Sequence, residues 1–207
     1  IVAPKAGCCG AIRYHLNDQD GGLDDMRKNI DAWWPYVEAG VEAIVMTASG
    51  CGVTVKEYGH LLAHDVAYAE RAKKISELTQ DLSEILPAFE TQLTARVNIS
   101  KRVAWHPPCT LQHGQQIRGK VESVLRAVGG DVTLCADSHL CCGSAGTYSV
   151  LNSDIAYTLR NRKLNHLDAL QPRAILSANV GCITHLQSGT EVPVKHWVEM
   201  LDAALAS

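Results

Sequence analysis

Two Cys-Cys-Gly triplets are the residues of this sequence best suited to chemistry. One is Cys8-Cys9-Gly10, and the other is Cys141-Cys142-Gly143, which is followed by Gly146. Adjacent side chains point in different directions on a helix or a strand, so one core cannot easily use both thiols. A glycine-rich turn can direct both thiols to one point, because glycine tolerates backbone angles that a side chain forbids. Two copies of so unusual a motif indicate a repeated device that holds a metal ion or an iron–sulfur cluster.

Each triplet is followed, after a similar interval, by a Gly-Cys pair. In the first half 41 residues separate Cys9 from Cys51, and in the second half 39 residues separate Cys142 from Cys182. Each interval contains a predicted helix and then a short apolar strand, so a duplicated module is predicted. The second copy also has an upstream cysteine, Cys109. The matching cysteine of the first copy would lie about two dozen residues before the first residue. We therefore expect the chain to be the C-terminal part of a longer protein, cut inside its first module.

The elements that position these cysteines alternate between strand and helix patterns. Hydrophobic residues at three- and four-residue steps predict helices over 20–39, 55–62, 75–85, 117–128, 153–170 and 197–204. Short apolar runs predict strands over 43–47, 103–106, 131–134, 174–177 and 192–194. This alternation predicts an α/β fold of two pseudo-symmetric duplicated modules, with mostly parallel sheets flanked by helices. The polar segment 88–101 is predicted to be irregular and to divide the modules, which then span residues 1–98 and 99–207.

The candidate ligands follow predicted strands or lie in turns that open helices, where sites of open α/β sheets gather. The second module offers four thiols from three loops, and they are Cys109, Cys141, Cys142 and Cys182. His185 follows in Cys-x-x-His spacing, and either a ligand role or a structural role fits it. The first module offers Cys8, Cys9 and Cys51, with Thr54 at the position that matches His185. Soft thiolates select zinc or iron–sulfur clusters.

Other residues with reactive side chains are expected to be structural. Cys135 is predicted to be a small buried hydrophobic residue outside the site. Four histidines are predicted to have structural roles, and they are His106, His113, His139 and His196. A run of basic side chains is predicted to be a solvated helix face, and it comprises Arg160, Arg162, Lys163 and His166.

Composition restricts the class of protein. The 207 residues are 46% hydrophobic and 20% charged, as in globular proteins with a hydrophobic core. A formal net charge of −3 gives no reason to expect nucleic acid or an anionic membrane as a partner. No apolar run approaches the roughly 18 residues that a transmembrane helix needs. The eight cysteines punctuate α/β segments, which favours thiolate ligands in a reducing cytoplasm over a disulfide scaffold.

The longer motifs resemble a known family. The pattern Cys109-x31-Cys141-Cys142-Gly143-x38-Cys182, preceded by His106-Pro107-Pro108, is similar to the cysteine-rich CCG module that occurs in pairs in heterodisulfide reductases and their relatives. Further segments narrow this resemblance, and they are 7–11, 14–16, 29–34, 47–52, 55–59, 109–113, 137–148 and 181–186. Together they resemble the iron–sulfur subunit of bacterial glycolate oxidase over essentially the whole chain.

This resemblance implies an electron-transfer subunit of an oxidoreductase of the glycolate dehydrogenase type, with no catalytic residue of its own. Partner subunits that carry FAD would oxidise glycolate to glyoxylate, and electrons would pass to a membrane acceptor such as quinone. The protein would be cytoplasmic and peripheral at the inner membrane. The family's subunit also has an N-terminal ferredoxin-like part with two 4Fe–4S clusters, which lies outside this sequence.

The chain departs from the family's five-cysteine pattern at one position in each module. Thr54 and His185 stand where the last cysteine of each Cys-x-x-Cys is expected. The type of centre is therefore left undecided between a cubane 4Fe–4S cluster, a non-cubane 4Fe–4S cluster and, in one module, a zinc ion. Two other functions are also left open. They are a structural zinc module that bridges subunits and a thiol–disulfide protein.

Overall fold

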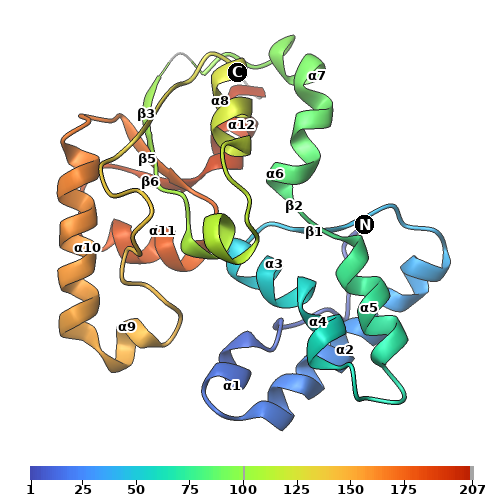
Figure 1. Cartoon of the computed structure of the whole chain (residues 1–207). Coiled ribbons are helices and arrows are strands. Elements are labelled where there is room, and N and C mark those ends of the chain that lie inside the picture. The colour runs from blue at the N-terminus through green and yellow to red at the C-terminus, as the bar shows by residue number, and fades with distance from the viewer. Residues whose placement is uncertain (100, 206–207) are drawn as a thin grey trace. The chain divides into compact units, whose positions relative to one another are not determined.

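Two compact units make up the chain. The computed structural model describes residues 1–99 and 101–205 (Figure 1). The first unit is Ile1–Leu82, and the second begins at Ser83. The predicted dividing segment, 88–101, lies later in the chain and within the second unit, although Ser100 is outside the described residues. It contains a helix over Glu90–Thr94, and the side chains of Val97 and Ile99 beyond this helix are buried.

The first unit is mainly helical around two short parallel strands. Its elements are α1 (Ala11–His15), α2 (Gln19–Glu38), β1 (Ile44–Met46), α3 (Ser49–Lys56), α4 (Tyr58–Leu61), α5 (Ala69–Leu78) and β2 (Thr79–Asp81). Helix α2 begins after Asp18, whose carboxylate accepts a hydrogen bond from the Gly21 amide at 3.1 Å. This N-cap satisfies one of the donors that a helix start leaves unpaired. The core of the unit includes Met26 and Ile30 of α2, which have no exposed surface.

The strand β2 corrects one prediction. The periodicity over 75–85 predicts one amphipathic helix, but Thr79–Asp81 leaves the helix and pairs in parallel with β1, with Thr79 opposite Ile44. The backbone groups of β1 need hydrogen-bond partners, and the tripeptide Thr-Gln-Asp supplies them. Pairing in the tertiary structure overrides the local helical pattern here.

The second unit contains a four-stranded parallel sheet. Its elements are α6 (Leu82–Ile85), η1 (Leu86–Phe89), α7 (Glu90–Thr94), β3 (Arg102–Trp105), η2 (Thr110–Gly114), α8 (Lys120–Ala127), β4 (Asp131–Leu134), α9 (Tyr148–Leu151), α10 (Ser153–Asp168), β5 (Ala174–Ser177), α11 (Val180–Gln187), β6 (Val194–His196) and α12 (Trp197–Leu205). The strand order is β4-β3-β5-β6, and every pair is parallel. All four residues of β5 are buried, as expected for a central parallel strand. The predicted α/β class is confirmed.

The path of the chain through this sheet creates a crevice. From β3 the chain passes through α8 to β4, and it then returns past β3 through α10 to β5. Right-handed crossovers in opposite directions place helices on both faces. Accordingly, α10 and α11 lie on one side of the sheet, and α8 and α12 lie on the other (Figure 1). In such sheets ligands bind outside the carboxyl ends of the strands where the order reverses, which here means β3 and β5.

None of the described helices combines the length and the apolar character that crossing a bilayer requires.

Candidate functional site

Four thiols meet at the carboxyl edge of the sheet in the second unit. Cys109 follows β3 and precedes the short π-helical turn η2. Cys141 and Cys142 lie on the long loop after β4, and Cys182 lies in the first turn of α11, after β5. Their sulfur atoms form a hydrogen-bonded series in which Cys109 contacts Cys141, Cys141 contacts Cys142, and Cys142 contacts Cys182. The structure therefore brings the four predicted thiols together at the crevice.

His106 also belongs to this cluster. It directly follows β3, is buried, and has a ligand atom within 4.8 Å of those of Cys142 and Cys182. Its ring nitrogens make no well-aligned hydrogen bond to a described residue, and the nearby ring helps to lower the pKa of the Cys182 thiol. A buried imidazole without such a bond is unfavourable unless something else binds it. The expectation of a merely structural role is therefore revised, because the ring faces two thiols and is available as a ligand.

The four thiols have unequal affinities for protons. Hydrogen bonds from Cys109 and then from Cys142 lower the pKa of the Cys141 thiol, and a hydrogen bond from Cys142 lowers the pKa of Cys182. The same contacts, together with burial, raise the pKa of Cys109 and of Cys142. Thiolates are thus favoured at alternate positions of the series. A cationic metal centre would favour the thiolate at all four positions, since the thiolate is the form that binds metal.

Polar side chains tie down the loop that carries Cys141 and Cys142. The Gln112 amide donates to the carbonyl oxygens of Pro107 and Ser138, at 3.1 and 3.2 Å. Lys163 of α10 donates its ammonium to the carbonyl oxygen of Asp137 at 2.5 Å. Because its side chain is only 2% exposed, the expectation that Lys163 lies on a solvated helix face is wrong. The helical pattern alone could not reveal that this loop covers the helix.

Two other predicted residues have contacts outside this group. His185 is buried, its Nε2 lies 3.2 Å from the carbonyl oxygen of Ala156, and its ring stacks on that of Tyr157 with centroids 6.0 Å apart. The cluster of close ligand atoms contains His106 and not His185. Cys135 packs in the hydrophobic core, and burial raises the pKa of its thiol.

The glycine of each triplet has the same structural role. Gly143 has φ +94°, and a Cβ atom there would overlap the carbonyl oxygen of Ala156 in α10. Gly10 has φ +85°, and a Cβ atom there would overlap the carbonyl oxygen of Gly22 in α2. Only glycine suits a left-handed backbone that also packs directly against a helix.

The first unit brings three thiols together. Cys9 contacts both Cys51 and Cys8. Its hydrogen bond lowers the pKa of Cys51 to about 7, whereas the bond with Cys51 raises the pKa of Cys9. Cys8 is exposed and Cys51 is half-buried, so this group is more open to solvent than the one in the second unit. The Thr54 hydroxyl donates to the carbonyl oxygen of Gly50 in its own helix.

Two side chains that the sequence analysis quoted only within family-like segments, and not as site residues, hold the first triplet. Asn29 of α2 donates to the carbonyl oxygen of Cys8 at 2.6 Å and accepts from the Gly7 amide at 2.7 Å. The Tyr58 hydroxyl donates to the carbonyl oxygen of Cys9 at 2.9 Å. The available signal was Asn29 itself, a polar residue beside Ile30 on the apolar face of α2.

Comparison with known proteins agrees with this architecture. Residues 1–56 and 103–187 match the sequence model of a family called CCG and described as "Cysteine-rich domain". The chain is 51% identical over 205 residues to the glycolate oxidase iron-sulfur subunit of Escherichia coli K12, covering 99% of this chain and 50% of that protein. It is 26% identical over 193 residues to the probable glycolate oxidase iron-sulfur subunit of Bacillus subtilis 168, covering 92% of this chain and 43% of that protein. It is 24% identical over 204 residues to lactate utilization protein A of Geobacillus thermodenitrificans NG80-2, covering 94% of this chain and 82% of that protein. The chain thus spans about half the length of the first two relatives.

Proposed function

Because this chain belongs to the cysteine-rich domain family, we propose that it is the electron-transfer part of the iron–sulfur subunit of a glycolate oxidase. The observation that carries the proposal is the convergence of four thiols and one buried imidazole at the reversal point of the sheet. The high identity to a glycolate oxidase subunit supports glycolate over lactate as the substrate of the complex.

We assign the ligands of the second unit from this geometry. Four thiolates would hold the cluster, with His106 as a fifth donor in place of His185, and they are Cys109, Cys141, Cys142 and Cys182. An iron–sulfur cluster, when bound, accepts and releases single electrons. The Gly143 amide donates to the Cys141 sulfur at 3.3 Å, and the Asn179 amide lies 3.6 Å from the Cys182 sulfur. Such hydrogen bonds stabilise negative charge on sulfur and raise the reduction potential. In the first unit, Cys8, Cys9 and Cys51 would hold a second, more open centre.

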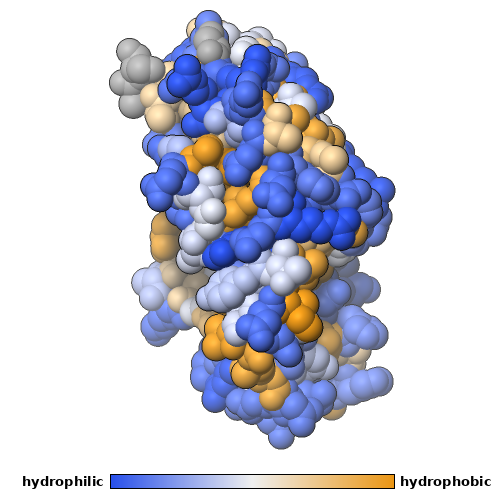
Figure 2. Space-filling model, turned by 90° about the vertical axis from the view of Figure 1, so that its left-hand side faces the viewer, coloured by the Kyte–Doolittle hydropathy of each residue, from blue (hydrophilic) through white to orange (hydrophobic). Residues whose placement is uncertain are grey.

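We place the oxidation of glycolate on partner subunits that carry FAD, since the described thiols act here as ligands. The helices beside the second site expose apolar side chains, and they include Val150, Leu151, Ile155 and Val180. Figure 2 shows apolar patches on an otherwise mainly hydrophilic face. Exposed apolar surface near a redox site supports contact with another protein. Electrons would pass on to a membrane acceptor such as quinone, with the complex peripheral to the inner membrane on the cytoplasmic side.

A structural zinc ion is the second candidate. The favouring observation is that His106, Cys142 and Cys182 form a compact set of one nitrogen and two sulfur donors within 4.8 Å. Zinc accepts such mixed sets in tetrahedral sites.

Metal analysis of the anaerobically purified protein, combined with electron paramagnetic resonance, tests both candidates. We expect iron and acid-labile sulfide in the wild type. Cys182→Ser should lose one electron paramagnetic resonance signal, and Cys135→Ser should keep every signal of the wild type. Cys135→Ser is the matched control, because this buried cysteine lies outside the thiol series. Stoichiometric zinc without sulfide would instead support the structural site. In the assembled complex, Cys182→Ser should also abolish glycolate-dependent reduction of the acceptor.

A further inference from the structure

A basic cavity lies at the opposite end of the sheet from the cysteines. Its volume is about 1070 Å³, and it surrounds the amino ends of the strands of the second unit. Arg102 is the first residue of β3, Arg173 immediately precedes β5, and Lys195 lies in β6. Lys101 precedes β3, so four cationic side chains from three segments reach one cavity.

The two acidic side chains of the cavity offset only part of the charge of its four cations. Asp131 pairs with Arg102, with 3.4 Å between Oδ2 and Nε. Glu199 accepts a hydrogen bond from the His196 amide at 2.7 Å. The side chains of the other three cations form no ion pair with any described residue, and they are Lys101, Arg173 and Lys195. This local excess of positive charge occurs in a chain whose formal net charge is −3.

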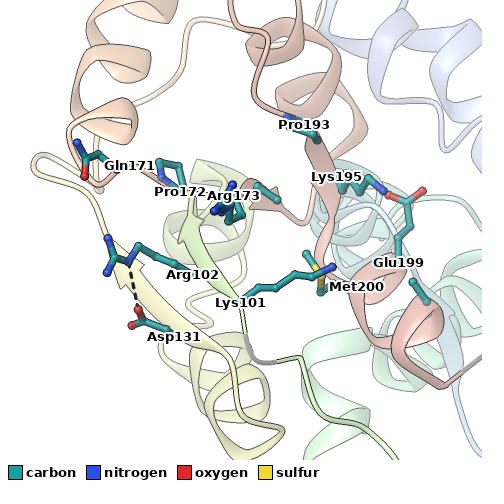
Figure 3. A pocket seen from close by; sticks show the side chains of 12 residues that line it. Lys101, Arg102, Asp131, Gln171, Pro172, Arg173, Pro193, Lys195, Glu199 and Met200 are labelled. Carbon is teal, nitrogen blue, oxygen red and sulfur yellow. Dashed lines mark hydrogen bonds and ion pairs between the residues drawn. The ribbon is translucent and has the colours of Figure 1, made fainter. Parts of the chain in front are cut away.

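The arrangement of the cations suits a ligand that bridges the cavity. In Figure 3, Arg102 and Asp131 lie on one side, Lys101 and Lys195 lie on the other, and Arg173 lies between them. Apolar side chains line the rest, and they are Pro172, Ala174, Pro193, Met200 and Ala203. Guanidinium groups match the geometry of phosphate oxygens, and ammonium groups add point charges. The volume lies just above the usual range for small-molecule sites, about 300–1,000 Å³, and is far larger than a free phosphate ion needs.

We propose that this cavity binds a phosphate-bearing organic molecule. Arg173 and Lys195 hold the phosphate, Lys101 adds positive charge, and the organic part packs on the prolines and Met200. The phosphate belongs either to a soluble ester or to the headgroup of an anionic phospholipid. This inference does not depend on the cysteine site, because the cavity lies at the other edge of the sheet.

The test measures the binding of two probes to the whole chain. One probe is ADP, followed by titration calorimetry, and the other is a vesicle of phosphatidylglycerol and phosphatidylcholine, followed by flotation. We expect saturable binding of one probe, weakened at least about tenfold in Arg173→Gln and in Lys195→Gln, since each removes one direct contact. Lys120→Gln is the matched control, because Lys120 is an exposed cation of the same unit that does not line the cavity.

The two arms distinguish the sources of phosphate. Binding of ADP alone assigns a soluble phosphate ester, and binding of the anionic vesicles alone assigns a phospholipid headgroup. The proposal is overturned if neither probe binds, or if Lys120→Gln weakens binding as much as the cavity variants do. Because the substituted side chains are exposed, thermal unfolding should show that every variant is folded.

Discussion

His106 and Lys163 are two buried, ionisable side chains beside the thiols of the second unit. His106 contributes a ring nitrogen within 4.8 Å of the sulfur atoms of Cys142 and Cys182. Lys163 contributes a cation, and burial lowers the pKa of its ammonium while the nearby cysteines and Asp137 counteract that shift. Together with Cys141 it lines a small cavity between α10 and the cysteine loop. The two residues should therefore differ in function, one as a ligand and the other as a source of positive potential.

We expect His106→Ala to weaken metal or cluster binding in the second unit at least about tenfold, because it removes a donor that a buried centre would use. The measurement is competition with a chelator, followed through iron content. His185→Gln is the control, because its ring already bonds to a backbone carbonyl. Equal retention of iron in His106→Ala and the wild type would show that the imidazole is not a ligand.

Lys163→Met should lower the reduction potential of a cluster in the second unit. Removing a nearby positive charge disfavours the reduced state, and the ratio of reduced to oxidised cluster at a fixed potential should fall about tenfold, which is about 59 mV for one electron. Potentiometric titration followed by electron paramagnetic resonance measures this shift. Arg162→Met is the control, because Arg162 is exposed and paired with Asp137. If a signal is present and its potential is unchanged, Lys163 does not tune the cluster.

At the scale of the elements, each cysteine triplet packs on the second of the two helices that follow it. The first triplet packs on α2 through Gly10, and the second packs on α10 through Gly143. The glycines set both the turn and the distance between the turn and the helix. This shared construction supports the proposed duplication, since a helix and then a strand also follow in each unit.

Replacing either glycine by alanine should destabilise its unit by roughly 3 kcal/mol, from a left-handed residue that carries a side chain and from overlap with a helix carbonyl. Gly40→Ala and Gly119→Ala are matched controls. Both glycines also have positive φ, but nothing lies within 4 Å of an added Cβ atom. The two control variants should therefore lose only about 1 kcal/mol of unfolding free energy, which is the cost of a left-handed backbone at a residue with a side chain. Chemical denaturation measures the differences, and equal losses in all four variants would exclude the overlap.

A second element-scale prediction concerns the ion pair that joins α2 to the loop after α4. The Arg27 guanidinium lies 2.8 Å from Asp65, and this contact lowers the pKa of the Asp65 carboxyl. A carboxyl whose pKa is lower in the folded state stabilises the fold above its unfolded pKa of about 3.9, and this contribution is lost as the pH falls further. The difference in unfolding free energy between wild type and Asp65→Asn should thus be present at pH 6 and shrink below about pH 4. Glu77→Gln, at an exposed position without an ion pair to the described residues, should show no such change. A difference that is independent of pH would contradict the assignment.

At the scale of the whole molecule, the two cysteine groups are unequal. The second unit gathers the buried His106 and four thiols, none of which is fully exposed, whereas the first gathers three thiols, of which Cys8 is exposed. Fewer donors and greater exposure both favour loss of metal to solvent. The second unit is therefore the stronger candidate for a stable redox centre.

We expect the second unit to retain iron longer than the first when the purified protein is treated with a chelator. In this experiment Cys51→Ser should remove the rapidly lost fraction, and Cys182→Ser should remove the slowly lost fraction. Iron content over time provides the measurement. A single rate of loss that neither substitution changes would contradict the inequality of the two sites.

The sequence by itself determined the α/β class and the candidate cysteine ligands, because both depend on local patterns. Strand segments such as 131–134 and 174–177 are short and clearly bounded, and the structure confirms them. Only the tertiary structure decided three features that depend on contacts between distant segments. Thr79–Asp81 became a strand because β1 needed a partner, and Lys163 became buried because the loop after β4 covers α10. His106 joined the thiols because β3 and β5 are adjacent in the sheet, which brings the loops after these strands together.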